Sequence, residues 1–167
     1  VWRAGFRHVK VGSAQAMNKD LITGYVKLGF QVVLSTGGHS LAELPKVHPL
    51  AGVLHCVSRY PCRVDEANLL RMLQLPKYWP SVPFGFSSHL DPLDTKCMET
   101  LKLASFLGAN LIEVHFTLSP RDETKDGPVS LYLGQLKDLC DFDRLSPHEK
   151  RLKKPEWGAL KCDEDPV

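Results

Sequence analysis

Several features that mark common protein classes are scarce or missing in this sequence. The five cysteines are odd in number and form no CxxC pair, which argues against a disulfide framework and against a zinc knuckle. Apolar runs stay far below the roughly 18 residues that cross a bilayer, and the first residues lack the apolar core of a signal peptide. We therefore expect a protein of a reducing compartment, cytoplasmic and not bound to a membrane.

Neither sign of charge is in large excess. The 21 Lys and Arg against 19 Asp and Glu leave a formal charge of +2, too small to drive nucleic-acid binding by counterion release. The one dense basic run, residues 148–154, reads as a solvated tail. What remains is the composition of one globular domain, with 43% hydrophobic and 24% charged residues in a chain of 167.

Apolar runs rich in β-branched residues recur along the chain, each followed by a turn and a helix-like segment. This alternation is typical of parallel βα units. Five such units occur, with predicted strands at 8–11, 31–34, 52–56, 82–86 and 110–115. The strands are therefore expected to form one parallel sheet.

The connections between these strands predict helices of unequal length. Asn18 is placed to cap a first helix that ends at Gly29, and Pro45 and Pro49 leave room for little more than one turn after the capping box at Ser40. Further helices are predicted at 65–75, 94–107 and 131–139, the first of them ended by Pro76 and Pro80. The chain thus divides into a domain at 1–141 and an extended, charged and Pro-bearing arm at 142–167.

Alternating βα units fit either an open doubly wound sheet or part of a closed barrel. No GxGxxG or P-loop motif occurs, so the dinucleotide-binding version of the open sheet has no support. Every predicted strand, and not only those at one switch point, is followed by polar residues that could contact a ligand. That distribution favours a partial (β/α)₈ barrel.

The polar residues at the strand ends suggest the kind of ligand. Serine and threonine hydroxyls and glycine amides suit a phosphate or carboxylate, and Lys10 adds a positive charge. His89 and His115 suit a divalent metal if they converge, although each taken singly is more commonly a hydrogen-bonded structural residue. The site is therefore predicted to bind an anion and, if the two histidines converge, to hold a metal beside it.

Five motifs in order resemble the N-acetylneuraminate (sialic acid) synthase family. They are Lys10-Val-Gly-Ser13, Leu34-Ser-Thr-Gly37, Leu54-His-Cys56 followed by Tyr60-Pro61, Ser87-Ser-His89, and Glu113-Val-His-Phe-Thr-Leu118. The resemblance implies an α/β fold in which the chain supplies about five βα units, corresponding to strands 4–8 of a TIM barrel. It also implies a metal-dependent condensation of phosphoenolpyruvate with an N-acetylated aldose of the N-acetylmannosamine type.

The resemblance assigns roles to individual residues. His89 and His115 would hold a divalent metal, Mn²⁺ or Mg²⁺. The substrate-binding residues would be Lys10, Ser13, Ser35, Ser58 and Ser87 for phosphoenolpyruvate, and Tyr60 and Asp126 for the acceptor sugar. Gln15 stands at the catalytic position where the family usually carries an acidic residue, and a carboxamide cannot carry a proton.

Other departures leave two hypotheses open. Ser88 replaces the acidic member of the family's Ser-Asp-His, and residues 124–128 rewrite a loop near Asp126. The first hypothesis is a synthase that needs the missing barrel units, restored either by another protein chain covering the open barrel edges or by absent sequence. The second is a catalytically degenerate half-barrel that serves as a structural or binding subunit.

Overall fold

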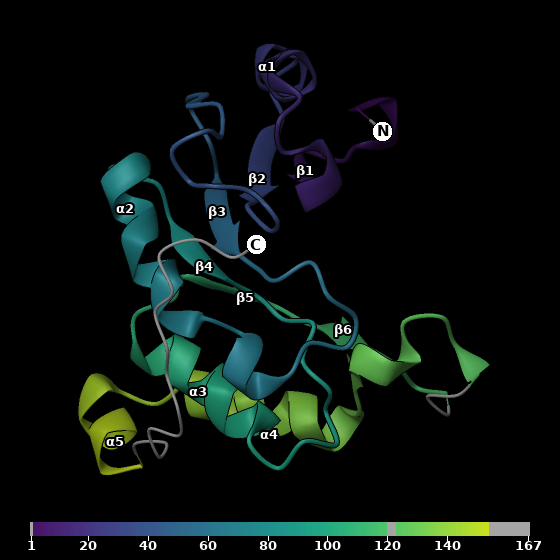
Figure 1. Ribbon diagram of the computed structural model, residues 1–167, viewed down its shortest axis with the longest axis vertical. Helices are drawn as coiled ribbons and strands as arrows, with labels where there is room; N and C mark the ends of the chain where they lie inside the picture. Colours follow the sequence, from purple (N-terminus) through teal and green to yellow (C-terminus); the bar gives the residue numbers. More distant parts are fainter. Residues whose placement is uncertain (1, 120–122, 154–167) are drawn as a thin grey trace.

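The computed structural model describes residues 2–119 and 123–153. Its centre is a sheet of five parallel strands, ordered β1-β2-β3-β4-β5, that curls through 195° into a half-barrel (Figure 1). The strands are β1 His8–Val11, β2 Gln31–Ser35, β3 Gly52–His55, β4 Phe84–Ser87 and β5 Leu111–Glu113. The predicted partial TIM barrel is therefore confirmed.

Side chains alternate between the two faces of each strand, which separates the core from the barrel interior. On the outward face, Val32, Leu34 and Val53 are completely buried beneath the outer layer. On the inward face, an open cavity of about 500 Å³ borders the sheet and the β5 edge, and its lining includes Lys10, Val33, Leu54, Leu111 and Glu113. The packed core thus lies outside the sheet, and the concave side stays open.

Three α-helices form close to their predicted positions. Helix α1 (Lys19–Lys27) begins where the Asn18 side chain accepts a hydrogen bond from the Leu21 N–H, at 3.0 Å. Helix α3 (Cys97–Phe106) ends just before Gly108, whose φ of 92° suits only glycine. Helix α4 (Leu133–Asp143) packs against α3. No helix in the described part of the chain is long and apolar enough to span a membrane.

Residues 40–51, the stunted connection, contain turns and no helix. The Glu43 N–H closes a single turn onto the Ser40 carbonyl. Beyond it, Lys46 Nζ donates to the carbonyls of Leu41 and Leu44 at 2.5 and 2.6 Å, where the next helical turn would have supplied backbone N–H groups. The prediction of little more than one turn agrees with this structure.

The predicted helix at 65–75 is wrong. The segment folds into the 3₁₀ turns η3 (Val64–Glu66) and η4 (Leu69–Gln74), because Asn68 between them adopts a left-handed conformation with φ of 45°. Pro76 does not end a helix; it lies in the first turn of α2 (Leu75–Tyr78), where its missing N–H leaves no hydrogen bond unmade.

The fifth predicted strand is interrupted at Val114. Its second part is β6 (His115–Phe116), which pairs in parallel with a strand that the sequence did not predict, β7 (Ser130–Leu131). The short turn η6 (Gly127–Val129) leads into β7. Two further 3₁₀ turns, η1 (Trp2–Ala4) and η2 (Ser13–Gln15), flank β1.

The expected extended arm after residue 141 is wrong for its first part. Helix α4 runs to Asp143, and α5 (Pro147–Leu152) follows, packed against α3 (Figure 1). Lys150 on α5 donates to Ser105 Oγ on α3 at 2.9 Å, and Ser105 donates to Asp143 Oδ1 at 2.5 Å. This network holds the three helices together. Residues 154–167 of the predicted arm lie outside the described residues.

Candidate functional site

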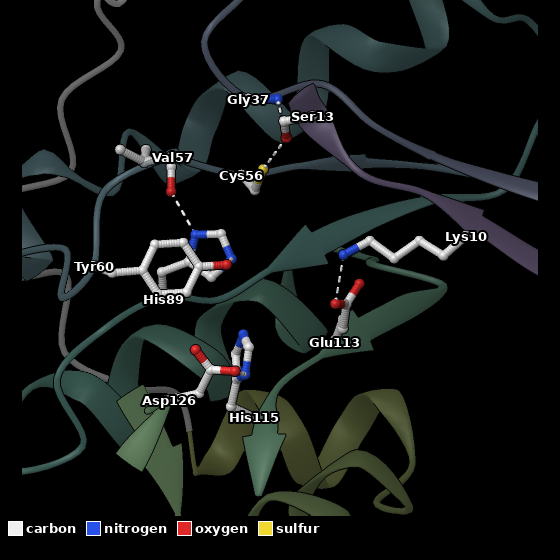
Figure 2. Close-up of polar contacts among 10 residues, drawn as sticks. All are labelled: Lys10, Ser13, Gly37, Cys56, Val57, Tyr60, His89, Glu113, His115 and Asp126. Carbon is white, nitrogen blue, oxygen red and sulfur yellow. Dashed lines mark hydrogen bonds and ion pairs between the residues drawn. The ribbon is translucent and has the colours of Figure 1, made fainter. Parts of the chain in front are cut away.

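The two edge strands of the half-barrel meet through an ion pair. Lys10 on β1 lies with its Nζ 2.5 Å from Glu113 Oε1 on β5 (Figure 2). Three strands separate them in the sheet, so they can meet only because the sheet curls. Both side chains remain about one-third exposed, at 37% and 34%. Lys10, predicted to bind an anion, thus faces a carboxylate that the sequence prediction left out of the site.

A cluster of small polar side chains surrounds Gly37, just beyond β2. The Gly37 N–H donates to Ser13 Oγ at 3.0 Å, and Ser13 Oγ lies 3.0 Å from Cys56 Sγ (Figure 2). A Cβ at position 37 would approach Ser58 Oγ to 2.5 Å and Cys56 Sγ to 2.6 Å. A side chain there would have to displace these groups, and the lack of one in glycine lets Ser13, Cys56 and Ser58 converge from three connections.

Two buried hydroxyls on the inner face lack a hydrogen-bond partner in the described part of the chain. Ser35 and Ser87 are each 1% exposed, and no protein partner lies within hydrogen-bonding distance of either Oγ among the described residues. Ser87 is paired in register with Glu113, and Ser35 with Leu54, so both serines share the face that lines the interior cavity. An unpaired buried hydroxyl costs about 1–3 kcal/mol, which makes a ligand or water a favourable occupant.

His89 is held in a defined protonation state. Its Nδ1 lies 2.6 Å from the Val57 carbonyl, which can only accept, so Nδ1 carries the proton. Its Nε2 lies 2.6 Å from the Tyr60 hydroxyl, and the two rings stack with centroids 3.9 Å apart (Figure 2). Burial lowers the pKa of His89 below its ordinary value of 6.5. The neutral ring therefore presents the Nε2 lone pair, which accepts the hydrogen bond that the Tyr60 hydroxyl donates.

His115, at the start of β6, completes the polar group around His89. The two imidazole centroids are 5.7 Å apart, and His115 Nδ1 lies 3.9 Å from Asp126 Oδ2 (Figure 2). In residues 2–119 and 123–153, no three His, Cys, Asp or Glu side chains are grouped as a metal site. Among these residues, His89 and His115 can therefore offer a metal ion at most two histidine ligands.

The remaining predicted residues lie at the margin or elsewhere. Gln15, at the end of η2, is exposed and takes part in none of these contacts within the described chain. Ser88 is buried and its Oγ accepts from the Leu90 N–H at 3.3 Å. His55 faces the outer layer, where its Nε2 lies 2.8 Å from the Ala67 carbonyl. Sequence reasoning overlooked Glu113 and Cys56, although both stand inside the recognised motifs.

Residues 2–149 match the profile of the NeuB family. The chain belongs to the NeuB family. The resemblance read from the five motifs is thereby confirmed, and the family includes proteins named as sialic acid and pseudaminic acid synthases. The strand-end residues described above all fall within the matched part of this NeuB chain.

Individual relatives agree with this assignment. N-acetylneuraminate-9-phosphate synthase of Mus musculus is 29% identical over 161 residues, covering 92% of this chain and 43% of that protein. Pseudaminic acid synthase of Helicobacter pylori is 31% identical over 145 residues, covering 82% of this chain and 41% of that protein. The chain therefore spans less than half the length of these relatives.

Solved structures show the same fold. The sialic acid synthetase of Leptospira borgpetersenii, determined in complex with citrate, superposes with a TM-score of 0.76 at 25% identity, covering 94% of this chain and 55% of that one. The spore coat polysaccharide biosynthesis protein SpsE of Bacillus subtilis gives a TM-score of 0.75 at 24% identity. The second likeness bears on the fold alone.

Proposed function

We propose that this NeuB chain carries part of a synthase site that joins phosphoenolpyruvate to an N-acetylated aldose. The observation that carries the proposal is the approach of His89 and His115, with Tyr60 and Asp126 beside them, next to the strand ends that hold Lys10. The names of the relatives support the product class, since they are synthases of sialic and pseudaminic acids.

The anionic end of phosphoenolpyruvate would lie between Lys10 and the serine hydroxyls. Ser35 and Ser87 have unused donors on the inner face, and Ser13 and Ser58 converge at Gly37. Hydroxyl and ammonium donors match phosphate and carboxylate oxygens. Lys10 would have to share its charge between Glu113 and the ligand, because Glu113 already occupies its Nζ.

His89 and His115 would hold the metal, Mn²⁺ or Mg²⁺. Val57 keeps the proton of His89 on Nδ1, so Nε2 is the atom free to bind an ion once the Tyr60 hydroxyl moves away. A divalent ion at such a site acts as a Lewis acid toward a carbonyl oxygen. Asp126 would orient His115 through its Nδ1 and would also approach the sugar.

The proposed reaction forms one carbon–carbon bond. C3 of phosphoenolpyruvate attacks the aldehyde carbon of the sugar, water adds its oxygen to C2, and the C–O bond to phosphate breaks as inorganic phosphate leaves. Tyr60 and Asp126 would orient the acceptor sugar. Gln15 can donate or accept a hydrogen bond but cannot take up the proton released by water, so that proton has to leave by another route.

A second function is favoured by the same side chains. Gln15 and Ser88 replace acidic residues, Lys10 is paired with Glu113, and His89 Nε2 is occupied by Tyr60. These contacts suit a site that no longer turns over. The alternative is a catalytically degenerate half-barrel that acts as a structural or binding subunit.

Metal binding separates the two functions. Equilibrium dialysis against Mn²⁺ and Mg²⁺ at pH 7.5, followed by metal analysis, should give one ion per chain for the synthase site. His89→Ala and His115→Ala should each weaken binding by at least about tenfold, because each removes one of two ligands. His8→Ala, an exposed histidine at the other end of β1, should leave binding unchanged. Failure of the unaltered chain to bind either metal would contradict a metal site formed by His89 and His115 in this chain and would favour the degenerate half-barrel.

A further inference from the structure

The outer layer of the half-barrel is thin beside β2 and β3. In a (β/α)₈ barrel each strand is followed by a helix of the outer ring. Residues 40–51, which follow β2, contain turns and no helix, and the connection after β3 supplies only the short elements η4 and α2 (Figure 1). An open cavity of about 620 Å³ lies between these two connections. Among the described residues, it shares no lining side chain with the interior cavity.

The lining of this outer cavity is polar and positively charged. Arg71 on η4 and Lys77 on α2 both border it. Lys46 adds a third cation nearby, with its Nζ 5.2 Å from the ring centroid of Tyr78, which also lines the cavity. Among the described residues that line it, none carries a carboxylate. The electrostatic character of the cavity therefore favours a negatively charged ligand.

Arg71 is the most buried of these three cations. It is 1% exposed, and its Nη2 donates to the His39 carbonyl at 2.7 Å. Removing a guanidinium group from water is costly, and a carboxylate or phosphate oxygen offsets that cost better than a neutral carbonyl does. An anion in the cavity would therefore compete with the His39 carbonyl for this guanidinium group.

Hydrogen bonds join this cavity to the polar cluster at Gly37. Arg71 holds the His39 carbonyl, and His39 Nε2 lies 3.0 Å from the Ser13 carbonyl. That carbonyl can only accept, so Nε2 carries the proton and donates it. The Ser13 hydroxyl oxygen in turn accepts from the Gly37 N–H at 3.0 Å. A ligand that draws Arg71 away from His39 thus acts on the loop that positions Ser13.

We propose that the outer cavity is a second binding site, which takes a small hydroxyl-bearing anion through its carboxylate or phosphate group and whose occupancy alters the contact between Ser13 and Gly37. Arg71 and Lys77 bind the anionic group. The hydroxyl and carboxamide that hydrogen-bond the rest of the ligand belong to Ser40 and Gln74, which also line the cavity.

The volume and the chemistry of the cavity suit a sugar acid or a sugar phosphate. About 620 Å³ is within the range of small-molecule sites. The product of the proposed reaction is a sugar acid, with one carboxylate and several hydroxyls. The second site rests on the proposed function only for this choice of ligand, since the anionic group alone can be tested with phosphate.

Amide hydrogen exchange of the full chain tests the second site with three probes: N-acetylneuraminate, inorganic phosphate and the neutral N-acetylmannosamine. At saturation, N-acetylneuraminate should slow exchange at residues 39–42 and 71–78 by at least about threefold, and the neutral sugar should not. Equal slowing by phosphate would assign the site to the anionic group alone, whereas slowing by N-acetylneuraminate only would assign it to a sugar acid. Exchange at the Gly37 amide should change with the same anion.

Substitutions separate this cavity from the site at Lys10. Lys77→Met should raise the anion concentration that half-protects residues 71–78 by at least about threefold, because it removes an ammonium group from the lining. Lys27→Met, at an exposed lysine of α1, should leave it unchanged. Lys10→Met should also preserve the slowing at 71–78. Arg71→Met should abolish it, and Lys77→Met decides the matter if that buried substitution prevents folding.

Three results would contradict the second site. They are unchanged exchange at residues 71–78 with both anions, slowing confined to β1 and β5, and equal behaviour of Lys77→Met and Lys27→Met. An unchanged Gly37 amide while residues 71–78 are protected would overturn the link to Ser13. None of these measurements needs metal or phosphoenolpyruvate, so a failure of the proposed function would be seen separately, in the dialysis experiment.

Discussion

Lys10 Nζ and Glu113 Oε1 lie 2.5 Å apart although their residues are 103 positions apart in the chain and stand on opposite edges of the sheet. The contact places a negative charge where the proposed substrate is an anion. A carboxylate in that position competes with phosphate or carboxylate groups for the lysine. The pair therefore controls how much positive charge the site offers to a ligand.

Glu113→Gln should strengthen the binding of phosphoenolpyruvate by about threefold to fivefold, since a partly exposed ion pair is worth up to about 1 kcal/mol. Lys10→Met should weaken it by about tenfold or more. Isothermal titration calorimetry at low salt would measure both. Glu66→Gln removes a comparable carboxylate, the partner of Arg59 at 2.7 Å, and should have no effect. Weaker binding in Glu113→Gln would instead show that Glu113 positions Lys10 for the anion.

Gly37→Ala should lower the free energy of unfolding by about 1–3 kcal/mol, because the new methyl group would lie 2.5 Å from Ser58 Oγ and 2.6 Å from Cys56 Sγ. Gly24→Ala is the matched control. Gly24 lies inside α1 with open space around it, so alanine there should raise stability by about 0.5–1 kcal/mol. Urea unfolding would compare the two. An unchanged midpoint for Gly37→Ala would mean that the hydroxyl cluster shifts freely.

The sequence predicts the half-barrel well because its signals are local. Each strand is a short apolar run, and Asn18 and Gly108 mark a helix start and a helix end by their own conformational preferences. The failures have causes that are not visible locally. Asn68 adopts a left-handed conformation that splits a predicted helix. The two-residue strand β7 is too short to show the alternation of apolar and polar residues that marks a strand.

In the candidate site, too, the sequence predicts what depends on local signals and misses what depends on the fold as a whole. The predicted strand ends bring His89 and His115 together, as expected when parallel strands finish at one edge of a sheet. The partners of these residues could not be read in the same way. The contact of Lys10 with Glu113 depends on the total curl of the sheet, and that of His89 with Tyr60 on the path of a loop.

His55 should make the protein less stable in acid. Its ring is 1% exposed, and burial lowers its pKa to about 4 from 6.5. Between these values the unfolded chain binds a proton that the folded chain does not, so stability is lost as the pH falls from about 6.5 to about 4. The loss from this one group amounts to roughly 3 kcal/mol.

Unfolding by urea at several pH values would test this. His55→Gln keeps a donor for the Ala67 carbonyl and has no titrating ring, so its stability should vary less with pH than that of the unaltered protein. His48→Gln, at an exposed histidine, should keep the original dependence. Parallel curves for the unaltered protein and His55→Gln would contradict the assignment.

Tyr60 decides whether His89 is available to a metal. Its hydroxyl occupies Nε2 at 2.6 Å, while Val57 holds the proton on the other nitrogen. Any ion that binds Nε2 must first displace this hydrogen bond, which costs about 0.5–1.5 kcal/mol. Tyr60→Phe removes the competing hydroxyl and keeps the ring that stacks on His89. The affinity for Mn²⁺ should then rise by about twofold to tenfold.

Dialysis against Mn²⁺ of the variant and the unaltered chain would measure this change. Tyr25→Phe is the control, because Tyr25 packs edge-on against Phe30, in the outer layer, and its hydroxyl is not in the site. A loss of affinity in Tyr60→Phe would mean that the hydroxyl itself binds the ion. In that case Tyr60 would supply the ion with a third ligand beside the two histidines. The hydrogen bond between Tyr60 and His89 would then mark the position that the ion takes.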